Sequence, residues 1–411
     1  MKKKIWIVSE FYYPIVTSTG FYMTEISEYL VSKGMDVHVI CTGAKYNEIE
    51  EYHPKKFEIH NGVNIYRVLI PEINKNNFVK RVFRLLLSSI FLSFKILKKV
   101  KRGEELLVVT NPAFLLILMP VISYLKGIRY KLLVHDIFPE NIVAISKMAT
   151  SSFGYKNLKK LFDKSYVNAD LCISIGRDMT EVIERKTKGK VKVELVPNWA
   201  DNKEVFPLRK EETQLYNQLN IPGFIFQFAG NLGHAQGLDN ILAAISLVEN
   251  MDISFLFIGG GAKVEMIKNF SEQKENVIYV GFQERSMQKD FLNACDVAIV
   301  TLSDGMYGLG VPSKSYNIMA AGKPILYIGD EKSEIALCIK EYNIGWLVKP
   351  NDPYSLKNAI ENIYYNRDKL MFIQNNARLV ADTVFAKERV LERYYALLSL
   401  SLIHISEPTR H

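Results

Sequence analysis

Residues 226–240, FQFAGNLGHAQGLDN, decide the fold of this chain. The stretch begins as an apolar strand, passes through glycines at positions 230, 233 and 237, and leads into the aliphatic period of a helix, ILAAISLV. A glycine-rich turn between a strand and a helix lets the backbone approach a ligand closely, and the free N–H groups at the helix start favour phosphate. The same turn also serves helix–strand packing, so the stretch alone leaves both interpretations open.

Strand and helix patterns alternate through the rest of the chain. In the first half, apolar strands such as KIWIVS and YKLLVHD are separated by segments with apolar residues at helical spacing. In the second half, FIFQFAG, ISFLFIGGG, VIYVGF, VAIVTL, PILYIG and GWLV repeat the pattern. Since 411 residues exceed one ordinary core, we expect an α/β fold of two Rossmann-like, doubly wound domains that face each other across a cleft. Such sheets bind ligands at the carboxyl ends of their strands.

Breaks in this pattern predict the domain boundaries. Residues 191–207, VKVELVPNWADNKEVFP, place two prolines among polar residues and are interpreted as the linker. The tail SLIHISEPTRH fits no element and is interpreted as disordered or non-native. We therefore expect an N-terminal domain over 1–200, a C-terminal domain over 201–376, a helix over 377–400 that packs back on the N-terminal domain, and the tail over 401–411.

The charge balance indicates an anionic partner. The chain has 52 Lys+Arg against 44 Asp+Glu, a net charge of +8, which fits nucleic acid, a phosphorylated ligand or an acidic membrane face. The four cysteines, at 41, 172, 295 and 338, form no Cys-x-x-Cys motif. They are typical of a reducing cytosol, and burial as small apolar residues is the simplest interpretation.

The glycine-rich strand end recurs twice in the second half. IGGGAKVEM, residues 258–266, ends a strand at three glycines and enters a helix. TLSDGMYGLGVPSKSYNIMAAGKPIL, residues 301–326, places Ser313 and Lys314 at the start of a helix. A hydroxyl, backbone N–H groups and an ammonium could clamp an anion there. Three such strand ends in one domain favour a phosphate-bearing ligand over an N-cap serine beside a solvated lysine.

Two further segments raise a membrane question. Residues 75–103, KNNFVKRVFRLLLSSIFLSFKILKKVKRG, contain nine Lys/Arg and no acid, which favours contact with an anionic membrane surface over a buried helix with basic ends. Residues 106–125 carry no charge and are about as long as a membrane span. Their internal Asn111 and Pro112 instead favour a buried strand followed by a helix, with Asn111 as the N-cap and Pro112 at the first helical position.

The motifs taken in order resemble the retaining GT-B glycosyltransferases of family 4, in particular the bacterial subgroup that builds surface polysaccharides. The resemblance spans nearly the whole chain and rests on the segments FYYPIVTSTG, HDIFPE, VPNWADNKEVFP, GNLGHAQGLD, IGGGAKVE, YVGFQERSMQKDFLNACDVAIV and GVPSKSYNIMAAGKPI.

The resemblance implies roles for individual residues. His135 matches the active-site histidine that contacts the transferred sugar, and Asp136 and Glu140 lie beside it. The resemblance places the donor among the following residues: Gly20, Gly230, Asn231, Gly233, His234, Gly260, Phe282, Glu284, Pro312, Ser313, Lys314 and Asn317. For His135, Asp136 and Glu140 the alternatives are an end-of-strand polar cluster and a helix cap.

The chain departs from the family at charged positions. The segment 230–239 has no Arg or Lys for the donor diphosphate, so Lys314 is expected to supply the charge. The usual Glu-x7-Glu pair is replaced by Leu309 and Asn317. There is no Asp-x-Asp triplet, so no metal cofactor is expected, and helix N-termini with Lys314 would stabilise the leaving diphosphate.

The resemblance implies transfer of a hexosyl or N-acetylhexosaminyl group, with retention, from a nucleotide diphosphate sugar, with UDP the expected nucleotide, to a lipid-linked or glycan acceptor in O-antigen, capsule or exopolysaccharide synthesis. The expected place is the cytoplasmic face of the plasma membrane, with no nucleic acid partner. A nucleotide-sugar 2-epimerase and a non-catalytic, membrane-docked nucleotide-sugar-binding subunit stay open. An NAD dehydrogenase is disfavoured, because SEFYYPIVTSTG follows the first strand where a dinucleotide needs Gly-x-Gly-x-x-Gly.

Overall fold

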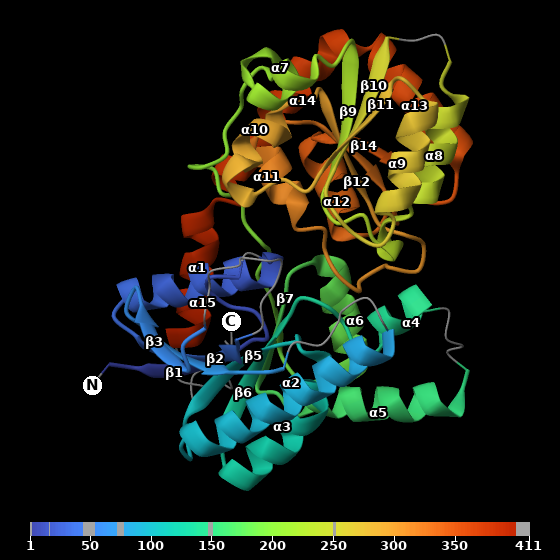
Figure 1. The fold of residues 1–411 in the computed structure, drawn as a ribbon. Helices are drawn as coiled ribbons and strands as arrows, with labels where there is room; N and C mark the ends of the chain where they lie inside the picture. Colours follow the sequence, from blue (N-terminus) through green and yellow to red (C-terminus); the bar gives the residue numbers. More distant parts are fainter. Residues whose placement is uncertain are drawn as a thin grey trace, which may run out of the picture. The chain divides into compact units, whose positions relative to one another are not determined.

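The computed structural model describes residues 2–15, 17–43, 54–71, 78–146, 151–249 and 252–399. The expected tail lies outside this part, as does the start of the basic segment. The chain forms two compact units: one runs to Val196 and takes up the chain again from Leu391, and the other is Pro197–Val390. In each unit helices cover a twisted sheet (Figure 1).

The first unit is built on a sheet with the strand order β3-β4-β2-β1-β5-β6-β7-β8. Neighbouring strands pair in parallel, except that β3 and β4 form an antiparallel hairpin. The hairpin turns at Asn61-Gly62, where both residues have positive φ. The strands are β1 (Lys4–Val8), β2 (Asp36–Thr42), β3 (Phe57–His60), β4 (Val63–Val68), β5 (Glu105–Val109), β6 (Arg129–Val134), β7 (Leu171–Ser174) and β8 (Val193–Leu195).

Helices connect these strands and pack beside one another. α2 lies against α3, α3 against α5, and α5 against α6. The bounds are α1 (Ser18–Ser32), α2 (Phe78–Lys99), α3 (Ala113–Lys126), α4 (Glu140–Ser146), α5 (Phe153–Val167) and α6 (Arg177–Thr187). Because β1 and β2 pair in parallel and α1 connects them, they form the parallel βαβ unit that the sequence predicts.

The uncharged stretch 106–125 divides between β5 and α3, as expected. The N-cap, however, is Pro112 rather than Asn111, and the helix ends at Gly127, which takes the left-handed conformation with φ 60°. In the part of the chain that the structure describes, no helix combines the length and the hydrophobicity that crossing a membrane requires.

The second unit has a sheet with the order β11-β10-β9-β12-β13-β14, in which every neighbouring pair is parallel. Both faces are buried. Along β9, Phe224, Phe226 and Phe228 enter one apolar cluster, and Ile225 and Ala229 enter the other. This explains why the strand is apolar without alternation. The strands are β9 (Phe224–Ala229), β10 (Ile253–Ile258), β11 (Val277–Gly281), β12 (Val297–Thr301), β13 (Ile325–Ile328) and β14 (Gly345–Val348).

The helices of this unit lie mostly between successive strands. They are α7 (Gln214–Leu219), α8 (Leu238–Leu247), α9 (Val264–Gln273), α10 (Gln288–Asn293), α11 (Lys314–Ala320), α12 (Glu334–Tyr342), α13 (Pro353–Tyr365) and α14 (Leu370–Thr383). All four cysteines of the chain are buried and unpaired, as expected.

The end of the chain differs from the single helix expected over 377–400. α14 packs against α11 and α12 within the second unit. After a short break, α15 (Lys387–Ser399) enters the first unit, where Glu392 binds Lys33 at 2.7 Å and the carbonyl of Leu397 accepts from Lys131 Nζ at 3.2 Å. Only α15 returns to the first unit, so the boundary on the C-terminal side lies within a helix, at Val390/Leu391.

Candidate functional site

Each sheet has a point where its connections change direction. In the first sheet it lies between β1 and β5, and in the second between β9 and β12. Parallel sheets bind ligands just beyond the carboxyl ends of the strands at this point. The loops after β9 and β12 meet there, because Ser303 N–H donates to the Ala235 carbonyl at 2.9 Å and Thr301 Oγ1 donates to the Gln236 carbonyl at 2.9 Å.

Backbone packing accounts for part of the glycine pattern. A Cβ added to Gly259, where φ is +139°, would lie 1.8 Å from the Gly230 carbonyl oxygen, and one added to Gly261 would lie 2.6 Å from that of Leu232. The loops also bond to each other, since Gly230 N–H donates to the Ile258 carbonyl at 2.8 Å. Close packing against the backbone of the turn after β9 therefore accounts for Gly259 and Gly261. A Cβ at Gly260 would meet no described atom within 4 Å.

Lys314 lies against this turn. Its Nζ is 3.5 Å from the centroid of the Phe228 ring, and a Cβ built at Gly230 would be 3.5 Å from the same Nζ. The Nζ is buried and makes no hydrogen bond or ion pair within the described residues. Burial lowers the pKa of Lys314 to about 7. The first and third glycine-rich segments thus meet at a buried amino group for which the described residues supply no anion.

The other expected donor residues are spread around this point. Asn231 and His234 are exposed in the turn after β9, Gly233 is buried there, and Pro312 and Ser313 directly precede α11, with Ser313 as its N-cap. Phe282 is 64% exposed after β11, and Glu284 is the N-cap of the turn Arg285–Met287 and accepts from Ser286 Oγ at 3.2 Å.

Asn317, for which the resemblance implies a ribose contact, is hydrogen-bonded within the protein. Its Oδ1 accepts from Asp201 N–H at 2.9 Å, and its Nδ2 donates to Gln288 Oε1 at 3.1 Å. The residue is 5% exposed. Its amide therefore joins α11 to the chain segment that enters the unit. Leu309, at the other position of the missing glutamate pair, is also buried.

His135 follows the last residue of β6. Thr110 Oγ1, beyond the end of β5, accepts from the backbone N–H groups of both His135 and Asp136 at 3.2 Å. The ring Nδ1 is 3.5 Å from Thr19 Oγ1, and the Nε2 is buried without a hydrogen-bond partner among the described residues. Burial lowers the pKa of His135 to about 4, so the imidazole is neutral at pH 7. Sequence reasoning missed Thr110, although its place at a strand end was the available signal.

The two acids near His135 differ from each other. Burial raises the pKa of Asp136 to about 6, although Asn141 Nδ2 donates to its Oδ1 at 2.8 Å. Burial also acts to raise the pKa of Glu140, but the ammonium groups of Lys186, at 2.8 Å, and Lys159, at 3.1 Å, outweigh it and hold that pKa below its usual value.

Glu140 is therefore part of an ion-pair cluster that joins helices. Lys186 of α6 also binds Asp163 of α5 at 2.6 Å and is buried. The carboxylate of Glu140 is thus paired with two lysines, and the catalytic role that the resemblance implies for it stays a prediction.

Gly20 lies in the first turn of α1, where its N–H donates to the side chain of the N-cap Thr17 at 3.0 Å. A Cβ there would lie 2.4 Å from the Ile15 carbonyl oxygen, so the tight β1–α1 connection accounts for this glycine. Two buried arginines that sequence reasoning missed support the same connection: Arg67 donates to the Tyr13 carbonyl at 2.6 Å, and Arg84 of α2 pairs with Glu10 at 2.7 Å.

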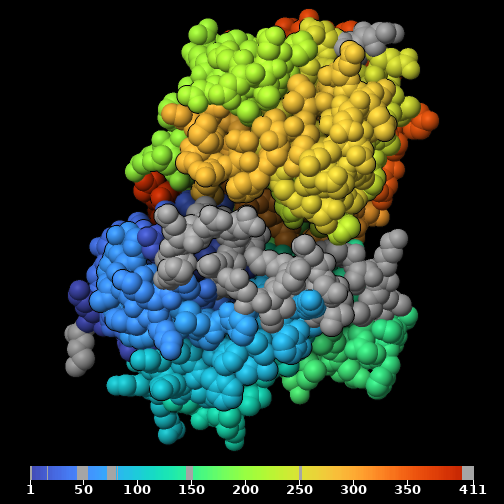
Figure 2. Space-filling model, viewed as in Figure 1, coloured from blue at the N-terminus to red at the C-terminus, as the bar shows by residue number. Residues whose placement is uncertain are grey.

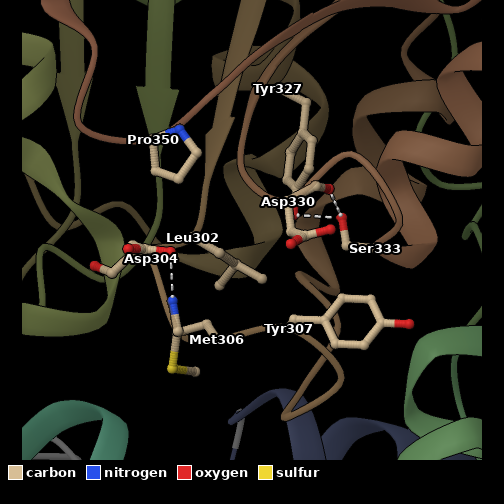
Figure 3. Close-up of a pocket in the computed structure, with 10 residues that line it drawn as sticks. Leu302, Asp304, Met306, Tyr307, Tyr327, Asp330, Ser333 and Pro350 are labelled. Atoms are coloured by element: carbon tan, nitrogen blue, oxygen red, sulfur yellow. Dashed lines mark hydrogen bonds between the residues drawn. The ribbon is translucent and has the colours of Figure 1, made fainter.

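A small pocket, partly open to solvent, lies at the carboxyl ends of β12, β13 and β14 (Figure 3). Ser333 Oγ bonds to the Tyr327 hydroxyl at 2.9 Å and to the Asp330 carbonyl at 2.7 Å. Asp304 and Asp330 supply carboxylates on opposite sides of Leu302. Two acids and no base make this pocket unfavourable for a diphosphate. Lys314, by contrast, places a basic group beside the turn after β9.

The described residues contain no group of three or more His, Cys, Asp and Glu side chains that could hold a metal ion.

Comparisons with known proteins identify relatives. A family model described as Glycosyl transferases group 1 matches residues 211–380. The chain is 37% identical over 368 residues to a Pseudomonas aeruginosa protein named as a glycosyltransferase, WbjE, covering 88% of this chain and 89% of that protein. It is 23% identical over 406 residues to WcaI of Escherichia coli (strain K12), named for colanic acid biosynthesis, covering 95% and 98%.

Solved structures resemble the chain over its whole length. The Anabaena protein Alr3699/HepE, solved in complex with UDP, superposes with a TM-score of 0.71 at 14% identity, covering 97% of this chain and 99% of that one. At this identity the likeness concerns the fold.

Proposed function

We propose that this chain, which belongs to the group 1 glycosyltransferases, transfers a sugar from a nucleotide diphosphate sugar to a lipid-linked or glycan acceptor. Its fold is GT-B, with two Rossmann-like α/β units, as the sequence predicts. The observation that carries the proposal is the buried amino group of Lys314, which has no anionic partner in the described part of the chain and lies where parallel sheets of this kind bind ligands.

The donor's diphosphate would bind beside Gly230 and Lys314. An ammonium in a water-poor site stabilises phosphate charge more strongly than the same group in solvent, and this charge grows as the diphosphate leaves. The segment 230–239 has no Lys or Arg, so Lys314 would be the main cation for this step. UDP as the nucleotide is supported by the similar fold solved with UDP.

His135 would hold a hydroxyl of the transferred sugar. Its neutral imidazole has a buried Nε2 without a partner among the described residues, and such an atom gains most from a ligand hydrogen bond. With its pKa at about 4, His135 does not serve as a strong base. A retaining route in which the departing phosphate accepts the acceptor's proton fits this environment. Asp136 and Thr110 would orient the strand end.

The acceptor would lie at a membrane. α2 exposes large apolar side chains at helical spacing, among them Phe83 at 54% and Phe94 at 63%, while its other side packs against α3, β2 and β4. Lys80, Lys98 and Lys99 lie exposed on the same helix, and the helix carries no acid. Parts of α2, coloured light blue to cyan, are visible at the surface in Figure 2.

An aromatic stripe flanked by lysines suits an anionic lipid surface, with the helix in the plane of the interface. The alternative of a buried helix with basic ends does not explain the exposed phenylalanines. A membrane-borne acceptor, surface polysaccharide synthesis and a place on the cytoplasmic face of the plasma membrane follow as proposals. The colanic acid relative supports them.

The test is an incubation of the purified chain with labelled UDP-hexoses and UDP-N-acetylhexosamines, with and without vesicles carrying polyprenyl-linked saccharides. We expect labelled sugar to appear on lipid only in the samples that contain the acceptor. The new glycosidic bond should keep the anomeric configuration of the donor. His135→Ala should abolish this transfer with little change in the melting temperature. Isomerised nucleotide sugar would instead indicate the epimerase, and binding without conversion would indicate a non-catalytic subunit.

A further inference from the structure

Phe228 places an aromatic ring under the ammonium of Lys314. The ring belongs to β9 and is 1% exposed, and the Nζ sits 3.5 Å from its centroid, well within the range of a cation–π contact. The face of an aromatic ring carries partial negative charge, so the ring attracts the ammonium but cannot satisfy its N–H donors. The lysine is held without being hydrogen-bonded.

Phe226, two residues earlier on β9, provides an internal comparison. It faces the same apolar cluster and is fully buried, but its ring stacks on Phe255 at 5.8 Å rather than on a cation. The two phenylalanines thus share strand, face and core, and differ in the lysine. A role of Phe228 toward Lys314 is separable from its role in packing.

We propose that Phe228 is a positioning residue: its ring holds the amino group of Lys314 in the donor-free protein, and the donor's diphosphate draws that group off the ring and binds it in the protonated form. This rests on the proposed function for the class of ligand, a nucleotide diphosphate sugar. The exchange replaces a weak ring contact by charge-assisted hydrogen bonds to phosphate oxygens. No bond between heavy atoms changes; where the Lys314 amine is neutral, it forms one N–H bond with a proton from solvent.

The charged and titratable groups on the elements packed against α11 leave burial as the cause of the low pKa of Lys314. α11 packs against α14, β12 and β13. On α14, Arg378 pairs with Asp382 at 2.7 Å, and on β13 Tyr327 bonds to Ser333. In the turn after β9, His234 is exposed. Asp239 of α8 pairs with Lys263. None of these groups is a source of the Lys314 shift; burial lowers its pKa to about 7.

The direction of the pH effect follows from these values. Above about pH 7 the donor-free lysine is mostly neutral, whereas a bound diphosphate favours the charged form. Donor affinity should therefore be constant below about pH 7 and fall as the pH rises above it.

The first test needs no donor. In protein labelled with [13C]lysine, the Cε/Hε resonance that is absent from Lys314→Arg identifies Lys314. We expect it displaced upfield by the ring current and inflecting at about pH 7. Phe228→Leu should remove the displacement and move the inflection down by about half a pH unit or more, whereas Phe226→Leu should do neither. An undisplaced resonance, or an inflection at about pH 10 as in free lysine, would overturn the proposal.

The second test is calorimetry of UDP-glucose binding at about pH 8 in two buffers that differ in ionisation enthalpy. UDP-glucose is chosen because its diphosphate, unlike that of UDP, does not titrate near neutrality. Uptake of close to one proton is expected for the wild type, and none for Lys314→Arg. Binding with no uptake would overturn the inference and leave the proposed function standing. No binding of UDP-glucose or GDP-mannose would overturn the proposed donor, while the resonance still decides the role of Phe228.

Discussion

At the scale of single residues, burial sets the chemistry more than neighbouring charge does. Lys314, His135 and Asp136 each owe their displaced pKa to loss of water, and each moves toward its neutral form. A ligand that brings charge to Lys314 or a hydrogen-bond partner to His135 gains what solvent no longer supplies. Glu140 and Asn317 show the opposite case, since protein partners already satisfy them.

Asp136 gives a prediction on stability. Its folded pKa of about 6 lies above the unfolded value, so the native state holds the proton longer and loses stability as the pH rises from about 4 to 6. Asp136→Asn removes this ionisation. Relative to wild type, the variant should gain about 1 kcal/mol or more between pH 5 and pH 8.

Urea unfolding of both proteins at the two pH values measures that difference. Asp170→Asn, at a partly exposed aspartate of the same unit that pairs with Arg129, is the control and should show no comparable gain. An Asp136→Asn difference that stays constant with pH would show that the carboxyl ionises normally.

At the scale of elements, one ion-pair cluster and one helix face determine what the first unit can do. The cluster of Glu140, Asp163, Lys159 and Lys186 holds α4, α5 and α6 together. It fixes the helix that directly follows the His135 loop. The outward face of α2 is independent of the cluster and remains open to a partner.

Glu140→Gln separates a structural from a catalytic role. The change leaves the buried Lys186 with one fewer counterion, which should destabilise the protein by about 3 kcal/mol. Turnover per folded molecule should stay within about threefold of wild type, because no reacting group is removed. Thermal unfolding and transfer assays on the same preparation test this. Glu184→Gln on α6 is the control. A large loss of turnover with intact stability in Glu140→Gln would instead support the catalytic role of Glu140.

Membrane docking should depend on the aromatic face of α2. Phe83→Ser with Phe94→Ser removes apolar area from the lipid contact and should weaken sedimentation with anionic vesicles about tenfold or more. Phe372→Ser on α14, where the ring is 65% exposed in the second unit, is the matched control. Equal sedimentation of all three proteins would remove α2 from the interface.

The charges of this segment should act separately from its rings. Replacing Lys98, Lys99, Lys101 and Arg102 by Gln should lower binding to anionic vesicles and reduce its dependence on salt. Binding to neutral vesicles should hardly change. If the quadruple variant sediments like wild type, the basic residues are simply solvated.

At the scale of the whole molecule, the sequence predicts the alternation of strands and helices well, because buried parallel strands are continuous apolar runs. It also predicts the helix start that carries Lys314 and the strand end that carries His135. It misses what tertiary contacts decide. The apolar period across 377–400 gives no sign of the break between α14 and α15, and the hydrogen bonds that occupy Asn317 come from Asp201 and Gln288, distant in sequence.

The division of labour between the units follows from their strand ends. The second unit offers an ammonium and a glycine-lined backbone to an anion, and the first offers a neutral imidazole to a hydroxyl. One arrangement suits a diphosphate and the other a sugar. These are the roles that the proposed function gives to the two groups in this member of the group 1 glycosyltransferases.

The affinity of the Lys314→Met variant for UDP-glucose, measured by calorimetry at about pH 6.5, tests this account most directly. Loss of the buried ammonium should weaken binding at least about tenfold, since a charge-assisted contact to phosphate contributes roughly 1.5–3 kcal/mol. Lys289→Met, which removes a lysine lying 4.7 Å over the Phe206 ring, should bind as wild type. Unchanged affinity in Lys314→Met would contradict the account.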